Sequence, residues 1–225
     1  MPEENVAEIR LGVDVGGTFT DLVAVAGGRV VSAKVPSTPA DQSTGVLNCV
    51  AAAGIETQDV RVFAHGTTVA TNALLERSGA TTALVTTEGF RDVIEIGRQN
   101  RASLYDLAAH HPPPLVPREL RFTVAERCGP EGIRRPLDAG SIGAVVSAVR
   151  DASVESVAVC LLFSYLHPKH EQEIRESLVE AGLQVSASSD VLPEFREYER
   201  FATTVADAYL SPKLAGYLQS LRARA

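Results

Sequence analysis

An octapeptide near the start of the chain, DVGGTFTD at positions 14–21, carries residue types that bind phosphate. Its two glycines follow a period-two strand, and a glycine turn there can point backbone N–H groups into one small space that binds an anion. Because glycine has no Cβ, a phosphate group can approach the main chain closely. The carboxylate of Asp14 suits Mg²⁺, directly or through water, and makes Asp14 a candidate catalytic residue. The candidate phosphate-binding residues are Gly16, Gly17, Thr18 and Thr20.

A plain glycine hairpin, with an aspartate that bonds its own turn, is the simpler interpretation of this octapeptide. The aspartate and the two threonines, placed at the first of three expected strands, favour the phosphate site. The sequence contains neither GxxxxGK[ST] nor GxGxxG, so a P-loop and a Rossmann site are both unsupported.

A second candidate site lies in the stretch AHGTTVATN at positions 64–72. A strand is expected to end at His65 and a helix to begin near Thr67, so that the helix N-terminus can hold a phosphate or a carboxylate. His65 is then a candidate general acid or base. The residues alone favour a simpler arrangement, in which Thr67 or Thr68 caps the helix and His65 is a turn residue. The candidate binding residues are Gly66, Thr67 and Thr68.

Other polar residues are weaker candidates. His167, His170 and Glu171 have ligand-type side chains, but they open a polar helix and are expected to be solvated. Arg98 and Arg101 could contact an anion, although an exposed loop explains them equally well.

Two further features are expected to be structural. Cys160 lies in an apolar strand and is expected to be an inert buried thiol. The charged run 194–200 is expected to be a solvated face.

Composition excludes several classes of protein. The chain has 225 residues, 45% hydrophobic and 22% charged, which is a globular balance. Its net charge is −7, so the chain lacks the basic character that is typical of a nucleic-acid binder. No apolar run approaches the ~18 residues of a membrane span, and the first ten residues lack a secretory pattern. The three cysteines are scattered, which argues against a disulfide framework or a CxxC metal site. We therefore expect a reduced, cytoplasmic protein with no nucleic-acid partner and no membrane partner.

The expected elements alternate in an α/β pattern. The first part gives strands over 9–15, 19–26 and 29–35, a helix over 41–53, a strand over 60–64, a helix over 67–78 and a strand over 82–86. Three antiparallel strands followed by alternating units, with right-handed crossovers, are typical of the RNase H-like sheet that actin, hexokinase and Hsp70-type ATPases use twice. After a long loop over 89–117, the second part is again α/β: an extended 120–127, a helix 138–150, a strand 156–163, a helix 168–181, a strand 183–187 and a helix 203–223 interrupted near Pro212.

Four long stretches, in this order, resemble the N-terminal region of the hydantoinase A/5-oxoprolinase family. They are VDVGGTFTD at 13–21, AHGTTVATNALLER at 64–77, TTEGFRDVIEIGRQNRASLYDL at 86–107 and VLPEFREYERFATTVADAYLSPKL at 191–214. The resemblance covers nearly the whole chain from Leu11 onward. The family includes ATP-dependent 5-oxoprolinases, N-methylhydantoinase A subunits and the β-type subunits of acetone carboxylase.

The resemblance implies an actin-like ATPase that uses ATP and Mg²⁺. ATP would phosphorylate the carbonyl oxygen of a small cyclic amide, of the 5-oxoproline or hydantoin class, before water opens the ring. It also implies a partner subunit of the hydantoinase B type. The residues that match the family's first phosphate-binding motif are Asp14, Gly16, Gly17, Thr18 and Thr20. Those that match a second signature, facing the expected active cleft, are His65, Gly66, Thr67 and Thr68.

Members of this family are several times longer than this chain. We expect residues 1–190 to be the N-terminal domain, with the first RNase H-like lobe and an α/β extension, and residues 191–225 to start the next domain in truncated form. No second DxGGT-like motif is present, so the isolated chain is expected to bind ATP weakly and to be inactive. Two alternatives stay open: a non-catalytic interaction module, or lone lobe completed by a partner chain, and a fragment of an acetone carboxylase β-type subunit.

Overall fold

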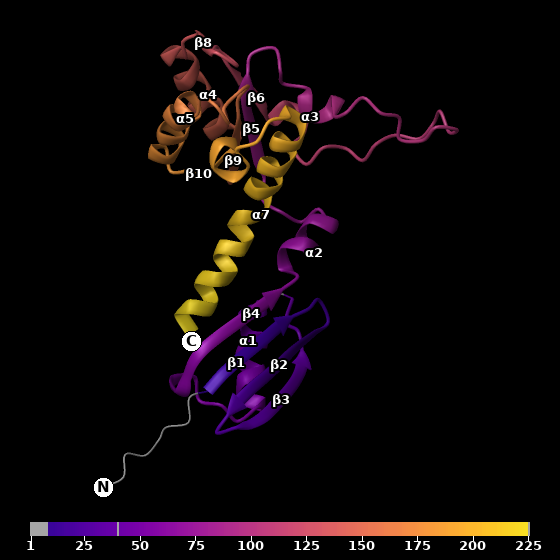
Figure 1. Ribbon diagram of the computed structural model, residues 1–225, viewed down its shortest axis with the longest axis vertical. Coiled ribbons are helices and arrows are strands. Elements are labelled where there is room, and N and C mark those ends of the chain that lie inside the picture. Colours follow the sequence, from indigo (N-terminus) through magenta and orange to yellow (C-terminus); the bar gives the residue numbers. More distant parts are fainter. Residues whose placement is uncertain (1–8, 40, 225) are drawn as a thin grey trace. The chain divides into compact units, whose positions relative to one another are not determined.

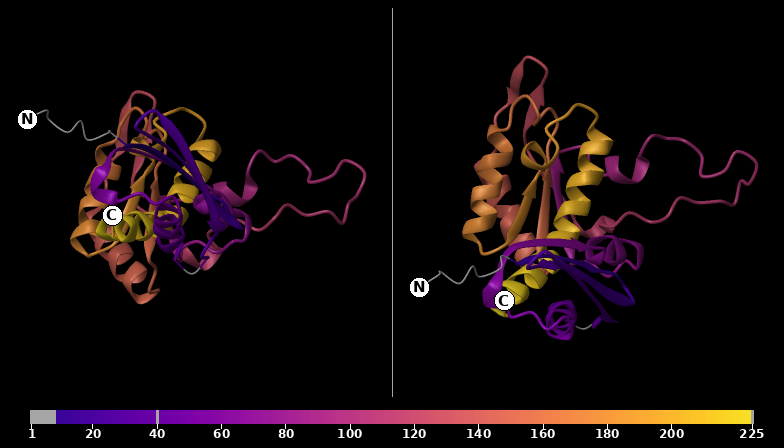
Figure 2. Two further views of the ribbon diagram at one scale, coloured as in Figure 1. Left: turned by 90° about the horizontal axis from the view of Figure 1, so that it is seen from below. Right: turned by 60° about the horizontal axis from the view of Figure 1, so that its bottom comes forward.

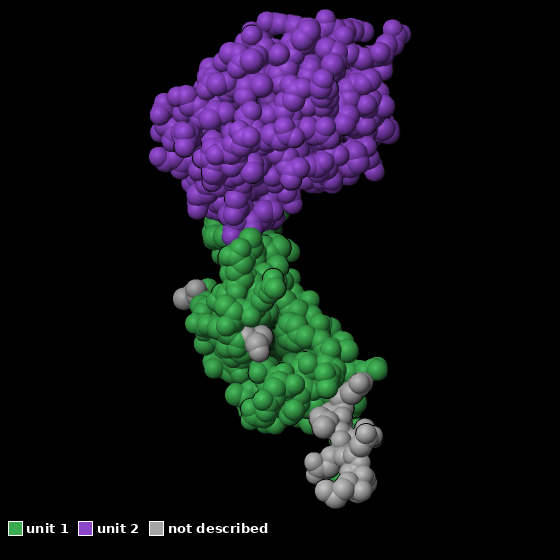
Figure 3. All heavy atoms as spheres, turned by 90° about the vertical axis from the view of Figure 1, so that its left-hand side faces the viewer, with its two compact units in different colours: residues 1–78, 213–225 green, residues 79–212 purple. Residues whose placement is uncertain are grey.

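A computed structural model describes residues 9–39 and 41–224 of the chain. The chain divides into two compact units, unit 1 with residues 1–78 and 213–225 and unit 2 with residues 79–212 (Figure 3). The expected domain boundary after residue 190 falls inside unit 2 and stays a prediction. Among the described helices, none combines the length and the apolar character that a membrane crossing requires.

Unit 1 is built on a four-stranded sheet with the order β3-β2-β1-β4 (Figure 1). The first three strands form an antiparallel meander, and β4 pairs parallel with β1. Gly27 and Gly28 both have positive φ, 55° and 75°, which suits the tight turn between β2 and β3. The elements are β1 (Ile9–Val15), β2 (Phe19–Ala26), β3 (Arg29–Pro36), α1 (Gln42–Ala52), the 3₁₀ helix η1 (Thr57–Asp59), β4 (Val60–Thr67), α2 (Val69–Leu75) and the last part of α7 (Glu197–Arg224). The expected meander is confirmed.

Helix α1 and the end of α7 cover one face of this sheet. Alternate apolar residues of β1 and β2 point into the resulting core, where they meet Val46 and Val50 of α1 and Leu221 of α7. Asp41 caps α1 by accepting a hydrogen bond from the Ser43 N–H at 3.1 Å. Arg224 donates to the same carboxylate at 2.8 Å and so fixes the end of α7 beside α1.

Unit 2 is a three-layer α/β structure on a parallel sheet with the order β10-β9-β5-β6. Helices α4 and α5 pack on one face and the first part of α7 on the other (Figures 1 and 2). This arrangement explains why β5 and β9 are buried along their whole length. The elements are β5 (Thr82–Thr87), α3 (Val93–Ile96), the 3₁₀ helix η2 (Arg118–Leu120), β6 (Arg121–Val124), β7 (Arg127–Gly129), β8 (Gly132–Arg135), α4 (Ala139–Asp151), β9 (Ser156–Cys160), α5 (Lys169–Glu180), β10 (Gln184–Ala187), α6 (Ser188–Val191) and residues 197–212 of α7.

Several expected elements differ from the structure. The strand predicted over 156–163 ends at Cys160, and the helix predicted over 203–223 begins earlier, at Glu197. The helix predicted over 67–78 is the shorter α2, because β4 continues through His65 to Thr67 alongside β1. The helix predicted to be interrupted near Pro212 is continuous in α7, although proline costs about 3 kcal/mol in a helix interior. Buried residues on both sides of Pro212, such as Tyr209 and Tyr217, hold α7 in place, so packing outweighs the local preference.

The long connection between α3 and η2 projects from unit 2 in each ribbon view (Figures 1 and 2). Its start is fixed by an ion pair of 2.6 Å between Arg98 and Glu199 of α7. Arg98 and Arg101 are both exposed, and Arg98 is engaged in this ion pair.

Candidate functional site

The two predicted glycine–threonine motifs meet where β1 and β4 end. Val15 pairs with Thr67 in the parallel ladder, and the N–H of Thr68 donates to the Val15 carbonyl at 3.2 Å. Asn72, in α2, lies against the first motif: a Cβ added to Gly17 would stand 3.3 Å from Asn72 Nδ2. Sheet register thus brings together two sequence segments about 50 residues apart.

The turn at Gly16 and Gly17 does not form the expected nest of convergent N–H groups. The N–H of Gly16 donates to the Phe19 carbonyl at 3.0 Å within its own turn, and neither glycine has positive φ. In the part of the chain that the structure describes, no acceptor takes the N–H of Gly17 or Thr18, and both residues are exposed. The glycines therefore matter because they have no Cβ and let another group approach the backbone closely, and not because they adopt an unusual backbone conformation. The N–H groups of Gly17 and Thr18 are the free donors.

Thr20 contacts the turn indirectly, through Ser37. Its side chain is fully buried, with Oγ1 3.1 Å from the Ser37 hydroxyl. Ser37 in turn donates to the Gly16 carbonyl at 2.8 Å. The structure thus gives Thr20 an indirect role, whereas the sequence predicted direct contact with phosphate.

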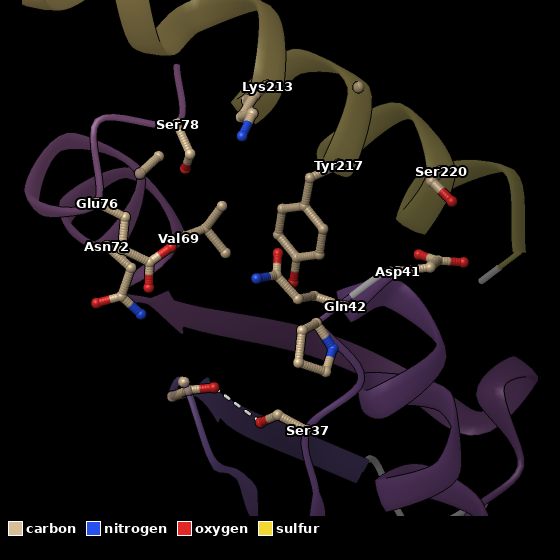
Figure 4. A pocket seen from close by; sticks show the side chains of 15 residues that line it. Ser37, Asp41, Gln42, Val69, Asn72, Glu76, Ser78, Lys213, Tyr217 and Ser220 are labelled. Atoms are coloured by element: carbon tan, nitrogen blue, oxygen red, sulfur yellow. Dashed lines mark hydrogen bonds between the residues drawn. The ribbon is translucent and has the colours of Figure 1, made fainter.

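A pocket of about 510 Å³ opens beside this turn (Figure 4). Lys213 and Tyr217 reach into it from α7, Asn72 from α2, and Glu76 from the position directly after α2. The rest of its lining is Gly16, Gly17, Ser37, Pro39, Asp41, Gln42, Val69, Ala73, Ser78, Gly216 and Ser220. An ammonium, an amide and hydroxyl groups suit phosphate oxygens, and carboxylates suit a bound Mg²⁺. No local sequence pattern predicts that Lys213 and Glu76 lie near the glycine turn, so these two residues could not be identified from the sequence.

Asp14 lies on the other face of the sheet and does not line this pocket. It is exposed, and it stands opposite Asp21 on β2 and Gly66 on β4. A Cβ on Gly66 would lie 3.0 Å from Asp14 Oδ1, so the missing side chain of Gly66 leaves room for this carboxylate. Metal binding by Asp14 stays a prediction.

His65 lies on the covered face of the sheet, underneath the pocket rather than in it. Its Nε2 is 2.6 Å from the hydroxyl of Tyr217, and its ring stacks on Phe63. Burial lowers the pKa of His65, which keeps the imidazole neutral, and burial raises the pKa of Tyr217 to about 12. Tyr217, for which no sequence pattern predicts a role, therefore stands between His65 and the pocket.

Thr67 and Thr68 serve the start of α2. The Thr67 hydroxyl accepts a hydrogen bond from the Val69 N–H at 3.1 Å, and the Thr68 hydroxyl accepts one from Asn72 Nδ2 at 3.3 Å. Thr68 is the N-cap residue but makes no capping bond with its side chain; it contacts Asn72 instead, and Thr67, one residue earlier, accepts the Val69 N–H.

In unit 2, His170 and Glu171 are buried, so their expected solvation is wrong. His170 Nδ1 lies 2.8 Å from Glu126 Oε2, and both side chains are almost fully enclosed. Glu171 accepts hydrogen bonds from the Leu161 N–H at 2.7 Å, the Ser188 hydroxyl at 2.7 Å and the Ser189 N–H at 2.8 Å. Burial nevertheless raises the pKa of Glu171. Helix α5 presents these polar side chains to the sheet rather than to water.

The charged run 194–200 is not a uniformly solvated face either, because Arg200 is fully buried. Its guanidinium donates to the Leu161 carbonyl at 3.0 Å, the Glu194 carbonyl at 2.8 Å, Glu197 Oε1 at 3.0 Å and the Ser188 hydroxyl at 3.2 Å. Cys160 is a buried free thiol whose pKa burial raises, as expected.

The fold of unit 1, a three-strand meander with a parallel fourth strand and a glycine turn beside a polar pocket, defines the class: the first lobe of an RNase H-like, actin-type ATPase fold. The family model of the hydantoinase/oxoprolinase N-terminal region matches residues 10–182. The chain therefore belongs to the hydantoinase/oxoprolinase family.

Two relatives carry the names of enzymes. The chain is 37% identical over 233 residues to caprolactamase subunit alpha of Pseudomonas jessenii, covering 96% of this chain and 33% of the relative. It is 30% identical over 246 residues to 5-oxoprolinase 1 of Arabidopsis thaliana, covering 94% and 19%. The chain thus spans at most about a third of these two relatives.

Two solved structures resemble this chain over almost its whole length. The crystal structure of the ATP-dependent caprolactamase from Pseudomonas jessenii matches with a TM-score of 0.81 and 35% identity, over 95% of this chain and 33% of that one. A nucleotide-free structure of acetone carboxylase, from work on ATP-dependent acetone carboxylation, matches with a TM-score of 0.82 and 26% identity, over 97% and 35%.

Proposed function

We propose that this chain forms the phosphate-binding part of an ATP-dependent enzyme that opens a small cyclic amide of the 5-oxoproline or hydantoin class. The observation that carries the proposal is the meeting of Gly17 and Asn72, from two separate family motifs, at the rim of a pocket that contains Lys213 and Glu76. The names of the caprolactamase and 5-oxoprolinase relatives support the substrate class.

Bound Mg-ATP would supply a phosphoryl group to the amide carbonyl oxygen. One water would then add to that carbon and the C–N bond would break, giving an acyl phosphate and an amine, and a second water would release phosphate from the acyl phosphate to leave a carboxylate. The free N–H groups of Gly17 and Thr18 would orient phosphate oxygens, and the Lys213 ammonium would offset their charge. Asp14 does not line the pocket, so its carboxylate would hold Mg²⁺ through water rather than directly. Neutral His65 would set the orientation of the Tyr217 hydroxyl at the pocket wall.

Residues 1–190 would be the N-terminal domain of the whole protein and residues 191–225 the start of the next, with a hydantoinase B type subunit as partner. The word subunit in the name of the caprolactamase relative supports a multi-subunit enzyme. If the chain were instead a non-catalytic interaction module, or a lone lobe completed by a partner chain, it would form a stable complex with that partner but would not turn over ATP by itself.

A carboxylase is the second candidate function. The likeness to acetone carboxylase covers nearly the whole chain with a TM-score of 0.82, which is as good as the likeness to caprolactamase. In both cases ATP would activate a carbonyl-derived oxygen, so the site described above serves either reaction. Substrate choice separates them: cyclic amides should stimulate ATP hydrolysis in one case, and ketones with bicarbonate in the other.

The test is substrate-stimulated ATP hydrolysis by the full-length gene product with its partner subunit. Asp14→Ala should abolish hydrolysis coupled to ring opening. Asp59→Ala, in η1 at the opposite end of the sheet, is the matched control and should keep wild-type turnover. Unchanged coupled turnover in Asp14→Ala would refute the role of this motif.

A further inference from the structure

Three buried side chains with metal-ligand chemistry lie together in unit 2, in a region that the proposed ATP chemistry does not use. They are Glu126, Cys128 and His170, which are between 2% and 4% exposed. Cys128 Sγ is 3.6 Å from His170 Nδ1, and Glu126 Oε2 is 2.8 Å from the same nitrogen. One ligand atom from each residue lies within 4.8 Å of the other two.

Local structure explains how these residues meet. Glu126 and Cys128 are two positions apart around the start of β7, and His170 is in the first turn of α5. Strands β7 and β8 form a separate two-stranded sheet, which pairs with no other strand among the described residues. An isolated two-stranded ribbon is marginally stable in water, so its position depends on side chains that attach it to the rest of the unit.

We propose that Glu126, Cys128 and His170 bind one divalent cation of the borderline-soft class, with Zn²⁺ foremost, which fastens the β7–β8 ribbon to α5. A thiolate, an imidazole and a carboxylate are ligands that zinc takes, whereas Mg²⁺ and Ca²⁺ prefer oxygen ligands alone.

The distances suit this ion with one small adjustment. A sulfur about 2.3 Å and a nitrogen about 2.0–2.1 Å from a tetrahedral zinc lie roughly 3.5 Å apart, close to the 3.6 Å between Cys128 and His170. The Glu126 oxygen, now at hydrogen-bond distance from His170, would move out by roughly half an ångström. The other Glu126 oxygen accepts a hydrogen bond from the Thr87 hydroxyl, which would keep the carboxylate oriented while it binds the metal.

Metal binding changes the protons of two ligands. The Cys128 thiol would lose its proton to solvent as the sulfur–metal bond forms, so binding releases one proton. His170 would bind through Nδ1, which places its remaining ring proton on Nε2. The hydrogen bond between His170 and Glu126 would be replaced by two bonds to the metal.

The competing arrangement is a hydrogen-bonded trio without metal. The test is zinc content of the 225-residue chain, purified with a tag that lacks histidine, saturated with Zn²⁺ under a non-thiol reductant and separated from free metal by gel filtration. We expect close to one zinc per chain. Loss of even an outer hydrogen-bonding partner weakens metal sites about 10- to 100-fold, so Cys128→Ser should weaken binding at least as much. Cys49→Ser, which removes another buried thiol, is the control and should keep the zinc.

Cobalt provides a second readout, which reports on the metal–thiolate bond itself. Co²⁺ added to the wild-type chain should give a thiolate-to-cobalt charge-transfer absorption, which Cys49→Ser keeps and Cys128→Ser loses. A wild-type chain without zinc after saturation, and without this absorption, would leave only the hydrogen-bonded trio. A folded Cys128→Ser chain that retains the metal would equally overturn the proposal.

Discussion

At the residue scale, the close approach of Asn72 to Gly17 makes the proposed phosphate site sensitive to a single methyl group. In Gly17→Ala the new Cβ would stand 3.3 Å from Asn72 Nδ2, at the rim of the pocket. We expect Mg-ATP affinity to fall about tenfold, equivalent to about 1.4 kcal/mol, with little change in the free energy of unfolding. Calorimetric titration of the full-length gene product measures this. Gly12→Ala adds a methyl group at an ordinary 3.8 Å from the Val23 carbonyl and should bind ATP normally. Equal affinities in the two variants would contradict the placement of the phosphate.

The hydrogen bond between Tyr217 and His65 gives a second residue-scale prediction. Tyr217→Phe removes a bond of 2.6 Å and should lower the free energy of unfolding by about 1 kcal/mol, measured by urea denaturation. Tyr165→Phe, whose hydroxyl makes no hydrogen bond among the described residues, is the control and should stay close to wild type. A Tyr217→Phe chain as stable as this control would show that the bond contributes nothing.

His65 also makes stability depend on pH. Because its pKa is lowered in the folded chain, the unfolded chain binds more protons below the unperturbed value of about 6.5. The free energy of unfolding should therefore fall as pH drops below about 6.5 towards the lower folded pKa. This part of the loss should disappear in His65→Gln and persist in His110→Gln, which changes an exposed histidine. Urea titrations at several pH values measure it, and identical profiles for the two variants would refute it.

At the element scale, Arg200 joins the start of α7 to the end of β9. Replacing it by methionine leaves the Leu161 carbonyl and Glu197 without their buried donor. We expect Arg200→Met to lose about 3–5 kcal/mol of unfolding free energy, measured by chemical denaturation. Arg196→Met removes an exposed guanidinium from the same segment and should stay within about 0.5 kcal/mol. A small loss for Arg200→Met would mean that α7 does not depend on this network.

The elements that sequence patterns predicted best are those with local causes. The strands over 9–15 and 19–26 coincide with β1 and β2, because alternation and glycine turns are encoded within each segment. Asp138 caps α4 as its position predicted. The burial of His170 and Arg200 could not be predicted in this way, since Glu126, the partner of His170, and Leu161, one partner of Arg200, are supplied by segments distant in the chain. The contact between His65 and Tyr217 likewise joins residues 152 positions apart.

At the scale of the whole molecule, the chain spans about a third of the caprolactamase relative. A single lobe would contact one side of the nucleotide, and closure around the substrate supplies much of the positioning that catalysis requires. We therefore expect the isolated 225-residue chain to bind Mg-ATP weakly and to release no phosphate above background. On the proposed function, a longer protein that contains this region should hydrolyse ATP in response to substrate when combined with the proposed partner subunit. Rapid turnover by the isolated chain would contradict the need for a second lobe.

Hydrogen exchange of the full-length gene product, with and without saturating Mg-ATP, tests the central claim most directly. If the two family motifs form the phosphate site, the amides of Gly17 and Thr18 and those of residues 68–73 should exchange more slowly with nucleotide bound. Amides around the buried Glu126 and His170 should be unaffected. Protection elsewhere in the protein, with no change at Gly17, Thr18 and residues 68–73, would contradict the account.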